Sequence, residues 1–234
     1  MKKYIHGSYG KSRWNGNARV FCLSMQKTGT TSVGDFFAHF GYPVARWKHS
    51  WENHWTKMWY DGNYEGIFDT KEFKHRQVFE DDPWWCPEFY KVLYHRFPNS
   101  KFILMVRDEN KWFQSMLKHS KGKTLGNTRI HCKLYRREQE FYNHMENDPN
   151  FKPSTDFLDN LMSLEGMDEH YKSIYRIRNK EIQLFFENKD KNRFICLSLE
   201  DSEKWKKLGA FMGIEVPDGF EVHSNESSKR DQNK

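Results

Sequence analysis

The chain has 234 residues, of which 37% are hydrophobic and 17% are aromatic. This length and composition are enough for one well-buried domain and exclude a disordered chain. The formal net charge of +6 favours an anionic partner, and a nucleic acid, an acidic glycan and a phosphorylated cofactor all fit it.

A single domain is expected to occupy residues 19–223. Residues 1–18 form a polar lead-in that is rich in Gly and Asn, and residues 224–234 form a polar tail that is expected to fray. Residues 19–223 contain no internal repeat and no change in amino-acid composition, so we expect one hydrophobic core.

Short apolar segments predict the strands of one sheet. "RVFCLSM" (19–25), "KFILMV" (101–106) and "RFICLSL" (193–199) are the strongest, and "GIFDT" (66–70) predicts a weaker strand. Helical patterns separate the strong strands, which is typical of an α/β fold with a central parallel sheet flanked by helices. The helices are expected from the first turn to Phe40, from Pro87 to Phe97, after Arg107, and over 128–148, 155–189 and 202–212.

Four tryptophans follow the first helix. Trp47, Trp51, Trp55 and Trp59 recur every four residues, which is helical spacing. Such a row more often packs against a core than binds a ligand. Its aromatic surface would also suit a sugar or a flat aromatic molecule, and the pattern does not choose between these uses.

The turn after the first strand reads "QKTGTTS". Gly29 allows successive backbone N–H groups to point at one anion, and the start of the next helix adds the positive end of its dipole. The turn lacks the G-K-[ST] order of a nucleoside triphosphate loop. An ordinary turn capped by threonines is the alternative. The residues expected to hold the anion are Lys27, Thr28, Gly29, Thr30, Thr31 and Ser32.

A second turn follows the strand over 101–106. Arg107 stands at the end of that strand, and Ser115 follows eight residues later in the next helix. A strand-end arginine can reach an anion on a neighbouring loop, and its planar fork suits phosphate oxygens. The structural alternative is that Arg107 pairs with Asp108 or caps the sheet. Ligands gather at the carboxyl ends of parallel strands, so both turns are expected at one edge of the sheet.

Together the two turns resemble the nucleotide-binding signatures of the sulfotransferases, which use 3′-phosphoadenosine 5′-phosphosulfate (PAPS). "QKTGTTS" resembles their 5′-phosphosulfate loop and "FILMVRDENKWFQS" their 3′-phosphate motif. The ending "LEDSEKWKKLGAFMGIEVPDGFEVHSNESS" is similar to the family's C-terminal pattern. The resemblance covers most of residues 19–226 and implies a P-loop-like sulfotransferase fold, with PAPS as cofactor and no metal ion.

The resemblance also implies a role for each of these residues. Residues 28–32 would hold the 5′-phosphosulfate, and Arg107 and Ser115 would fix the 3′-phosphate. Lys27 would neutralise the charge that grows on the bridging oxygen as the S–O bond breaks.

Two features depart from the cytosolic branch of that family. Ser32 stands where a tryptophan commonly stacks on the adenine, so Trp47 or Trp205 would have to supply that surface. The Arg-Lys-Gly-x-x-Gly loop near the C-terminus is absent. "KGKTLGN" (121–127) is interpreted as a mobile basic loop that covers the cofactor.

The resemblance implies that the catalytic base precedes the helix that leads into the strand over 101–106. The segment there reads "FEDDPWW", in which Asp82 is the best positional match and Asp81 and Glu80 are its neighbours. A carboxylate can accept a proton, and burial beside the tryptophans would raise its pKa toward a useful value. A solvated acidic turn that caps the next helix is the alternative.

The predicted function is transfer of a sulfuryl group from PAPS to a hydroxyl or amine of a small-molecule or glycan acceptor. A nucleoside or small-molecule kinase of related fold would need a G-K-[ST] loop and an acid that holds Mg²⁺. A basic nucleic-acid-binding protein would need basic and aromatic residues on one face, whereas acids are interleaved throughout, so no nucleic-acid partner is expected. Neither the acceptor nor the oligomeric state can be read from the sequence.

Further expectations concern location and metals. No apolar run approaches the roughly 18 residues that span a bilayer, and the N-terminus lacks the apolar region of a signal peptide. The four cysteines are far apart, which predicts neither a disulfide framework nor a zinc site. A cytoplasmic location is therefore expected.

Overall fold

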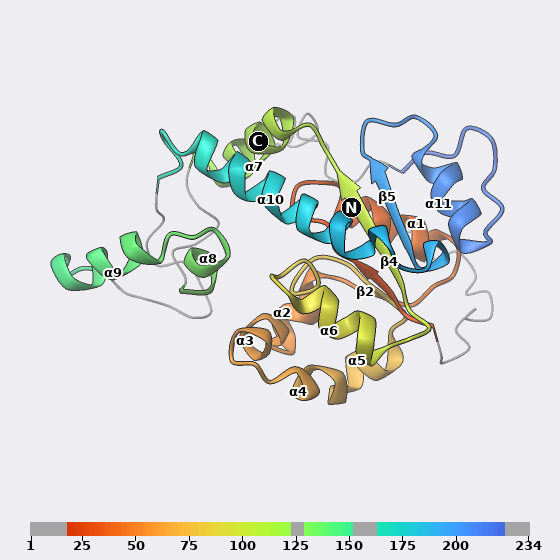
Figure 1. Ribbon diagram of the computed structural model, residues 1–234, viewed down its shortest axis with the longest axis horizontal. Helices are drawn as coiled ribbons and strands as arrows, with labels where there is room; N and C mark the ends of the chain where they lie inside the picture. Colours follow the sequence, from red (N-terminus) through yellow and green to blue (C-terminus); the bar gives the residue numbers. More distant parts are fainter. Residues whose placement is uncertain (1–17, 123–128, 152–162, 223–234) are drawn as a thin grey trace, which may run out of the picture.

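The computed structural model describes residues 18–122, 129–151 and 163–222 (Figure 1). The predicted tail, almost all of the predicted lead-in and most of the predicted loop over 121–127 lie outside the described residues.

Five parallel strands form one sheet in the order β2-β3-β1-β4-β5, with helices on both faces. This confirms the predicted α/β fold with a central parallel sheet flanked by helices. The strands are β1 (Val20–Cys22), β2 (Val44–Ala45), β3 (Val78–Phe79), β4 (Lys101–Val106) and β5 (Phe194–Ser198).

The three strong predicted strands are β1, β4 and β5. The registers pair Val20 with Lys101, and Phe102 with Phe194. β1 is buried throughout and β4 is buried except at its ends, which is why both read as continuous apolar runs. β2 and β3 were not predicted, because each has only two residues, which is too short to show the alternating pattern of a strand.

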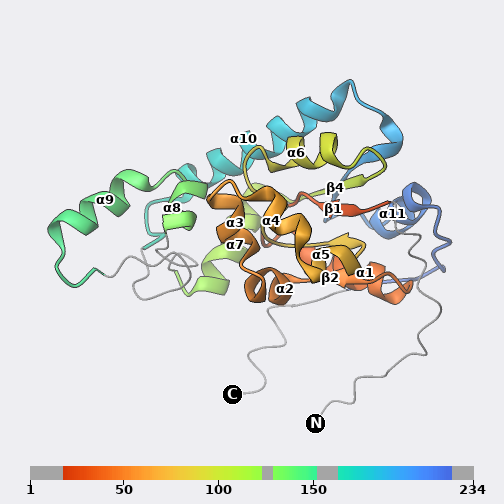
Figure 2. The same cartoon turned by 90° about the horizontal axis from the view of Figure 1, so that it is seen from below.

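Alternate side chains of the central strands pack into two separate apolar layers. Val20 and Ile103 pack with the layer that holds α1 and α11, whereas Phe21 and Phe102 pack with the layer that holds α6, α7 and α10. Figure 2 shows α6 and α10 on one side of the sheet and α1 on the other. The bounds of these helices are α1 (Thr30–His39), α6 (Phe89–Arg96), α7 (Glu109–Ser120), α10 (Asp168–Glu187) and α11 (Lys204–Met212).

The tryptophan row is helical, as predicted, but it forms two helices. α2 (Trp47–Glu52) and α3 (Trp55–Tyr60) are separated at His54, whose φ of +54° is left-handed. Trp55 and Trp59 are buried, as a packed face requires, whereas Trp47 and Trp51 are exposed.

The strand predicted over 66–70 is wrong. Residues 66–69 lie in α4 (Tyr64–Asp69), which begins where the Asn63 side chain accepts the Gly66 N–H at 3.1 Å. This side-chain cap favours a helix over the extended form that the apolar residues suggested. A further short helix, α5 (Lys71–His75), leads into β3.

The helix predicted over 128–148 is also two helices, α8 (Arg129–Leu134) and α9 (Glu138–Asn147). They are separated at Arg136, where φ is +52°. Figure 1 shows both to one side of the sheet. The helix predicted over 155–189 corresponds to α10, which starts at Asp168. Residues 163–167 precede it and are not helical, and residues 152–162 lie outside the described residues. A 3₁₀ turn (Lys191–Arg193) precedes β5.

Candidate active site

The loop between β1 and α1 has the sharp turn that the sequence predicted. Lys27 and Gly29 have positive φ angles of 68° and 90°, and Thr28 Oγ1 donates to the Met25 carbonyl oxygen at 2.6 Å. A Cβ atom at Gly29 would lie 2.8 Å from Leu199 Cδ1, just beyond the end of β5. Glycine therefore suits this position both by its left-handed backbone and by its close approach to β5.

The first turn of α1 completes this loop. Its first helical hydrogen bond runs from the Val33 N–H to the Gly29 carbonyl oxygen at 3.0 Å, so the amides before Val33 precede the helical ladder. Thr30 and Ser32 are buried at this end and Thr31 is partly buried. Amides at a helix N-terminus, together with the helix dipole, stabilise an anion.

Arg107 lies against this loop. Its Nη1 donates to the Lys27 carbonyl oxygen at 3.3 Å, while its Nε is buried and has no hydrogen-bond acceptor. The Glu200 carboxylate is 3.8 Å from that Nε, which is an ion-pair distance and not a hydrogen bond. A buried guanidinium N–H without an acceptor is costly, and a phosphate oxygen would satisfy it.

Asp108 does not pair with Arg107, so this part of the structural alternative is wrong. Its carboxylate accepts the N–H groups of Asn110 at 3.1 Å and Lys111 at 2.9 Å, and thereby caps α7. Ser115 lies in the second turn of that helix and is partly buried.

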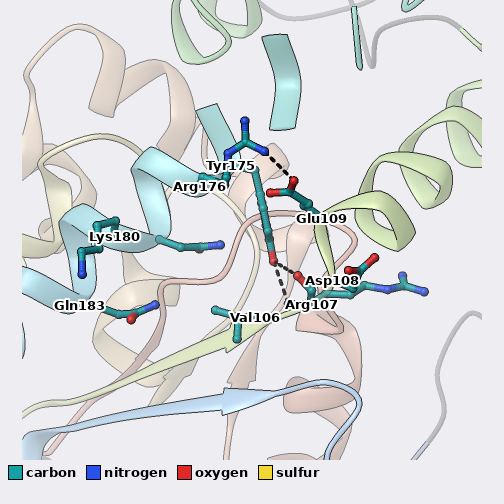
Figure 3. Close-up of a pocket in the computed structure, with 9 residues that line it drawn as sticks. Val106, Arg107, Asp108, Glu109, Tyr175, Arg176, Lys180 and Gln183 are labelled. Atoms are coloured by element: carbon teal, nitrogen blue, oxygen red, sulfur yellow. Dashed lines mark hydrogen bonds and ion pairs between the residues drawn. The ribbon is translucent and has the colours of Figure 1, made fainter. Parts of the chain in front are cut away.

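Tyr175 of α10 fixes the backbone at the end of β4 (Figure 3). Its hydroxyl accepts the Arg107 N–H at 2.8 Å and donates to the Arg107 carbonyl oxygen at 3.0 Å. Trp112 stacks on its ring with the centroids 4.4 Å apart. A hollow of about 620 Å³ lies beside these groups, where Arg176 pairs with Glu109 at 2.5 Å.

The acidic turn follows β3, which pairs with β1, so it lies at the same edge of the sheet as Lys27. Asp82 Oδ1 accepts the Trp85 indole N–H at 2.6 Å, and the Asp82 N–H donates to Asp81 Oδ1 at 3.0 Å. Burial raises the pKa of both aspartates, and the negative charge of Asp81 raises that of Asp82 further. The positive charge of Lys27 acts in the opposite direction on the pKa of Asp81.

Glu80 differs from the two aspartates because it packs against α1. It is 3% exposed, and a Cβ atom at Gly34 would lie 3.2 Å from its carboxyl carbon. Burial raises its pKa to about 8, and Arg46, 3.8 Å from Oε1, opposes this. Arg46 also pairs with Asp35 of α1 at 2.6 Å. The acidic turn is therefore not the solvated turn of the alternative interpretation, and Glu80 ties α1 to the start of α2.

Tyr135, which follows α8, also contacts the loop, although the sequence analysis did not find it. Gln26 Nε2 donates to its hydroxyl at 2.7 Å, and Trp112 Nε1 donates to the Gln26 carbonyl oxygen at 2.9 Å. Tyr135 is fully buried and stacks on Tyr171 with the centroids 4.7 Å apart. It therefore supports the residue next to Lys27 from outside the sheet.

The two candidate adenine platforms lie in different surroundings. Trp205 is 2% exposed and stacks on Phe36 with the centroids 5.5 Å apart, so it belongs to the core. Trp47 stacks on Trp51 at the surface.

Two absences apply to residues 18–122, 129–151 and 163–222 alone. There, no three His, Cys, Asp or Glu side chains come together in a group that could hold a metal ion. Nor does any described helix have the length and apolar character needed to cross a membrane.

Comparisons with known proteins give a family match. The family described as a sulfotransferase domain matches residues 19–229. Two solved structures are similar to the chain. A sulfotransferase from Alicyclobacillus acidocaldarius is 14% identical, with 92% of this chain and 89% of that chain covered and a TM-score of 0.48. The sulfotransferase domain from the curacin biosynthetic pathway is 13% identical, with 86% and 76% covered and a TM-score of 0.44. No curated protein matches the chain.

Proposed function

The chain belongs to the sulfotransferase domain family, and from this premise we propose that it transfers a sulfuryl group from PAPS to a hydroxyl or amine of an acceptor. The contact of Arg107 with the Lys27 carbonyl oxygen, at 3.3 Å, supports the proposal most directly. PAPS carries a 5′-phosphosulfate and a separate 3′-phosphate, so it requires two anion-binding segments that lie close together. The loop after β1 and the turn after β4 meet this requirement.

Each segment has donors that fit its part of PAPS. Residues 28–32 would bind the 5′-phosphosulfate through the amides and hydroxyls at the start of α1. Arg107 would bind the 3′-phosphate, and its buried Nε, which has no acceptor, supports this role. Ser115 would add a hydroxyl from α7.

The reaction breaks the S–O bond between the sulfuryl group and the bridging oxygen of PAPS and forms an S–O bond to a hydroxyl acceptor or an S–N bond to an amine. When bound, PAPS supplies the sulfuryl group, and 3′-phosphoadenosine 5′-phosphate (PAP) leaves with the bridging oxygen. Lys27 stabilises the negative charge that grows on that oxygen. Asp82 accepts the proton of the attacking acceptor, so that no strongly basic oxygen or nitrogen has to form.

Further parts of the proposal concern the acceptor and the compartment. The acceptor is a small molecule or a glycan, and no nucleic-acid partner is proposed. A cytoplasmic location rests on the four cysteines, all of which are free.

The donor is tested by thermal unfolding with nucleotides and without metal. We expect PAP to raise the melting temperature more than 5′-AMP does, because the 3′-phosphate adds charge-assisted bonds to Arg107. That advantage should largely vanish in Arg107→Ala and persist in Arg96→Ala, which removes an exposed arginine of α6 that pairs with Glu65. Equal stabilisation of the wild type by both nucleotides would refute the assignment.

Tyr135→Phe tests the support behind the loop. Gln26 loses one hydrogen bond, of about 1 kcal/mol, so turnover should fall by about threefold to tenfold. Tyr171→Phe is the matched control, because its buried hydroxyl accepts from Arg137 at 3.2 Å and not from the loop. Steady-state kinetics and melting curves of both variants check this. An equal loss of turnover in both would indicate a general effect of stability.

A further inference from the structure

Two tryptophans stand apart from the others in the described residues. Trp47 and Trp51 are 46% and 51% exposed, whereas the other six described tryptophans are at most 6% exposed. Burying a side chain of this size normally contributes a few kcal/mol to folding. About half of each of these two side chains therefore remains open to solvent.

The two indoles form one surface. They are four residues apart on α2, and their rings stack with the centroids 6.2 Å apart and an interplanar angle of 15°. Lys48 and Glu52, one position further round the helix, pair at 3.5 Å and lie beside the rings as polar groups. The result is an apolar surface of two near-parallel, offset rings, on a helix that also carries the charged groups of Lys48 and Glu52.

This surface begins beside the acidic turn. Arg46 immediately precedes α2, and its guanidinium is 3.8 Å from the Glu80 carboxylate. The Glu80 N–H donates to the Ala45 carbonyl oxygen at 3.1 Å, which fixes the end of β2 to the turn. Figure 2 shows α2 next to β2. The helix that carries the tryptophans therefore begins beside the turn that leads to Asp82.

We propose that Trp47 and Trp51 bind a saccharide acceptor, whose pyranose rings stack on the indoles while a hydroxyl of the same chain reaches Asp82. This inference rests on the proposed function and names its substrate class. The C–H face of a pyranose packs on an aromatic ring, and its hydroxyls bond to polar groups around that ring. The residues of α2 present both kinds of group.

The exposure of the pair favours a saccharide over a flat aromatic acceptor. Small aromatic ligands bind in concave sites that cover most of their surface. Each of these indoles is about half exposed and stands on a short surface helix. Such an open surface suits a ligand that stays partly hydrated and extends over more than one ring.

The test uses the full chain in the presence of PAP. Binding is measured on an array of neutral and acidic glycans, with 2-naphthol and a tyrosine-containing acidic peptide as competitors. Each glycan that binds is then assayed as an acceptor with labelled PAPS. The variants are Trp47→Ala, Trp51→Ala and the conservative Trp51→Phe, and the control is Tyr142→Ala, which removes an exposed aromatic ring from α9.

We expect at least one glycan to bind and to be sulfated. Each alanine variant should raise KM for that glycan by about tenfold, as loss of a stacking face predicts, with kcat and the PAP-induced rise in melting temperature unchanged. Trp51→Phe should retain most of the affinity, and Tyr142→Ala all of it.

The inference is overturned if no glycan binds while PAP still stabilises the protein, or if both alanine variants leave KM unchanged. It is also overturned if 2-naphthol or the peptide is the preferred acceptor. A wild type that PAP stabilises no more than 5′-AMP does would refute the proposed function itself, and the inference with it.

Discussion

Lys27→Ala is expected to lower turnover by about a hundredfold or more, as the loss of a preorganised charge at a reacting oxygen does. Lys27 lies between the sharp turn at Thr28 and the residue that Tyr135 supports, and its φ of +68° is held by both. Its positive charge lowers the pKa of Asp81 in the acidic turn. Single-turnover rates with saturating PAPS measure the effect on the chemical step alone.

The effect of each variant on nucleotide binding distinguishes the role of Lys27 from that of Arg107. Lys27→Ala should weaken PAP binding less than Arg107→Ala does, because Lys27 would contact the transferring group more than the nucleoside phosphates. Lys91→Ala is the control, since that lysine lies on α6 and pairs with Glu88, which precedes the helix. Near-normal turnover of Lys27→Ala would make Lys27 a surface lysine and would require another cation in the mechanism.

The parts of the fold that could be predicted are those in which local sequence and burial agree. "KFILMV" predicts a central strand because both of its faces are buried, and that strand is β4. The turn at Gly29 could be predicted because a left-handed backbone and a close approach both favour glycine. Once parallel strands are expected, the meeting of Arg107 with this loop follows from their shared edge.

The parts that could not be predicted depend on contacts between distant segments or on a single cap. Tyr135 and Tyr175 contact residues 109 and 68 positions away, and no spacing in the sequence reports such pairs. The apolar segment at 66–70 predicts a strand, although the cap at Asn63 starts a helix there. The row of tryptophans gave no sign that two of its four members would be exposed, because one continuous helix would carry all four on one face, whereas the chain forms two helices separated at His54.

Asp82→Asn is expected to lower turnover by about 10²–10⁴, the usual contribution of a general base, because the amide keeps the shape but cannot accept a proton. PAP affinity should stay nearly unchanged, since Asp82 is proposed to contact the acceptor. The hydrogen bond from Trp85 orients the carboxyl group, and the amide oxygen can still accept it. Turnover and the PAP-induced melting shift, measured on the same samples, check both statements.

The pH dependence gives a sharper test of the same residue. Burial and Asp81 raise the pKa of Asp82, and the base must be ionised to work, so the wild-type rate should rise with pH through a pKa well above that of an ordinary aspartate. This acidic limb should disappear in Asp82→Asn. In Asp81→Asn it should move to lower pH, because one negative charge beside Asp82 is removed.

The stability of the folded protein should also depend on the ionisation of Asp82. Because the folded state disfavours the ionised form of Asp82, the wild type loses stability as pH rises through that raised pKa, and Asp82→Asn escapes this loss. Glu80→Gln is the control for a buried carboxyl group that packs against α1 and should not alter the acidic limb. An active Asp82→Asn with an inactive Asp81→Asn would move the base by one residue. If all three variants remain active, the base lies outside this turn, and the raised pKa values reflect burial and neighbouring negative charges without a catalytic role.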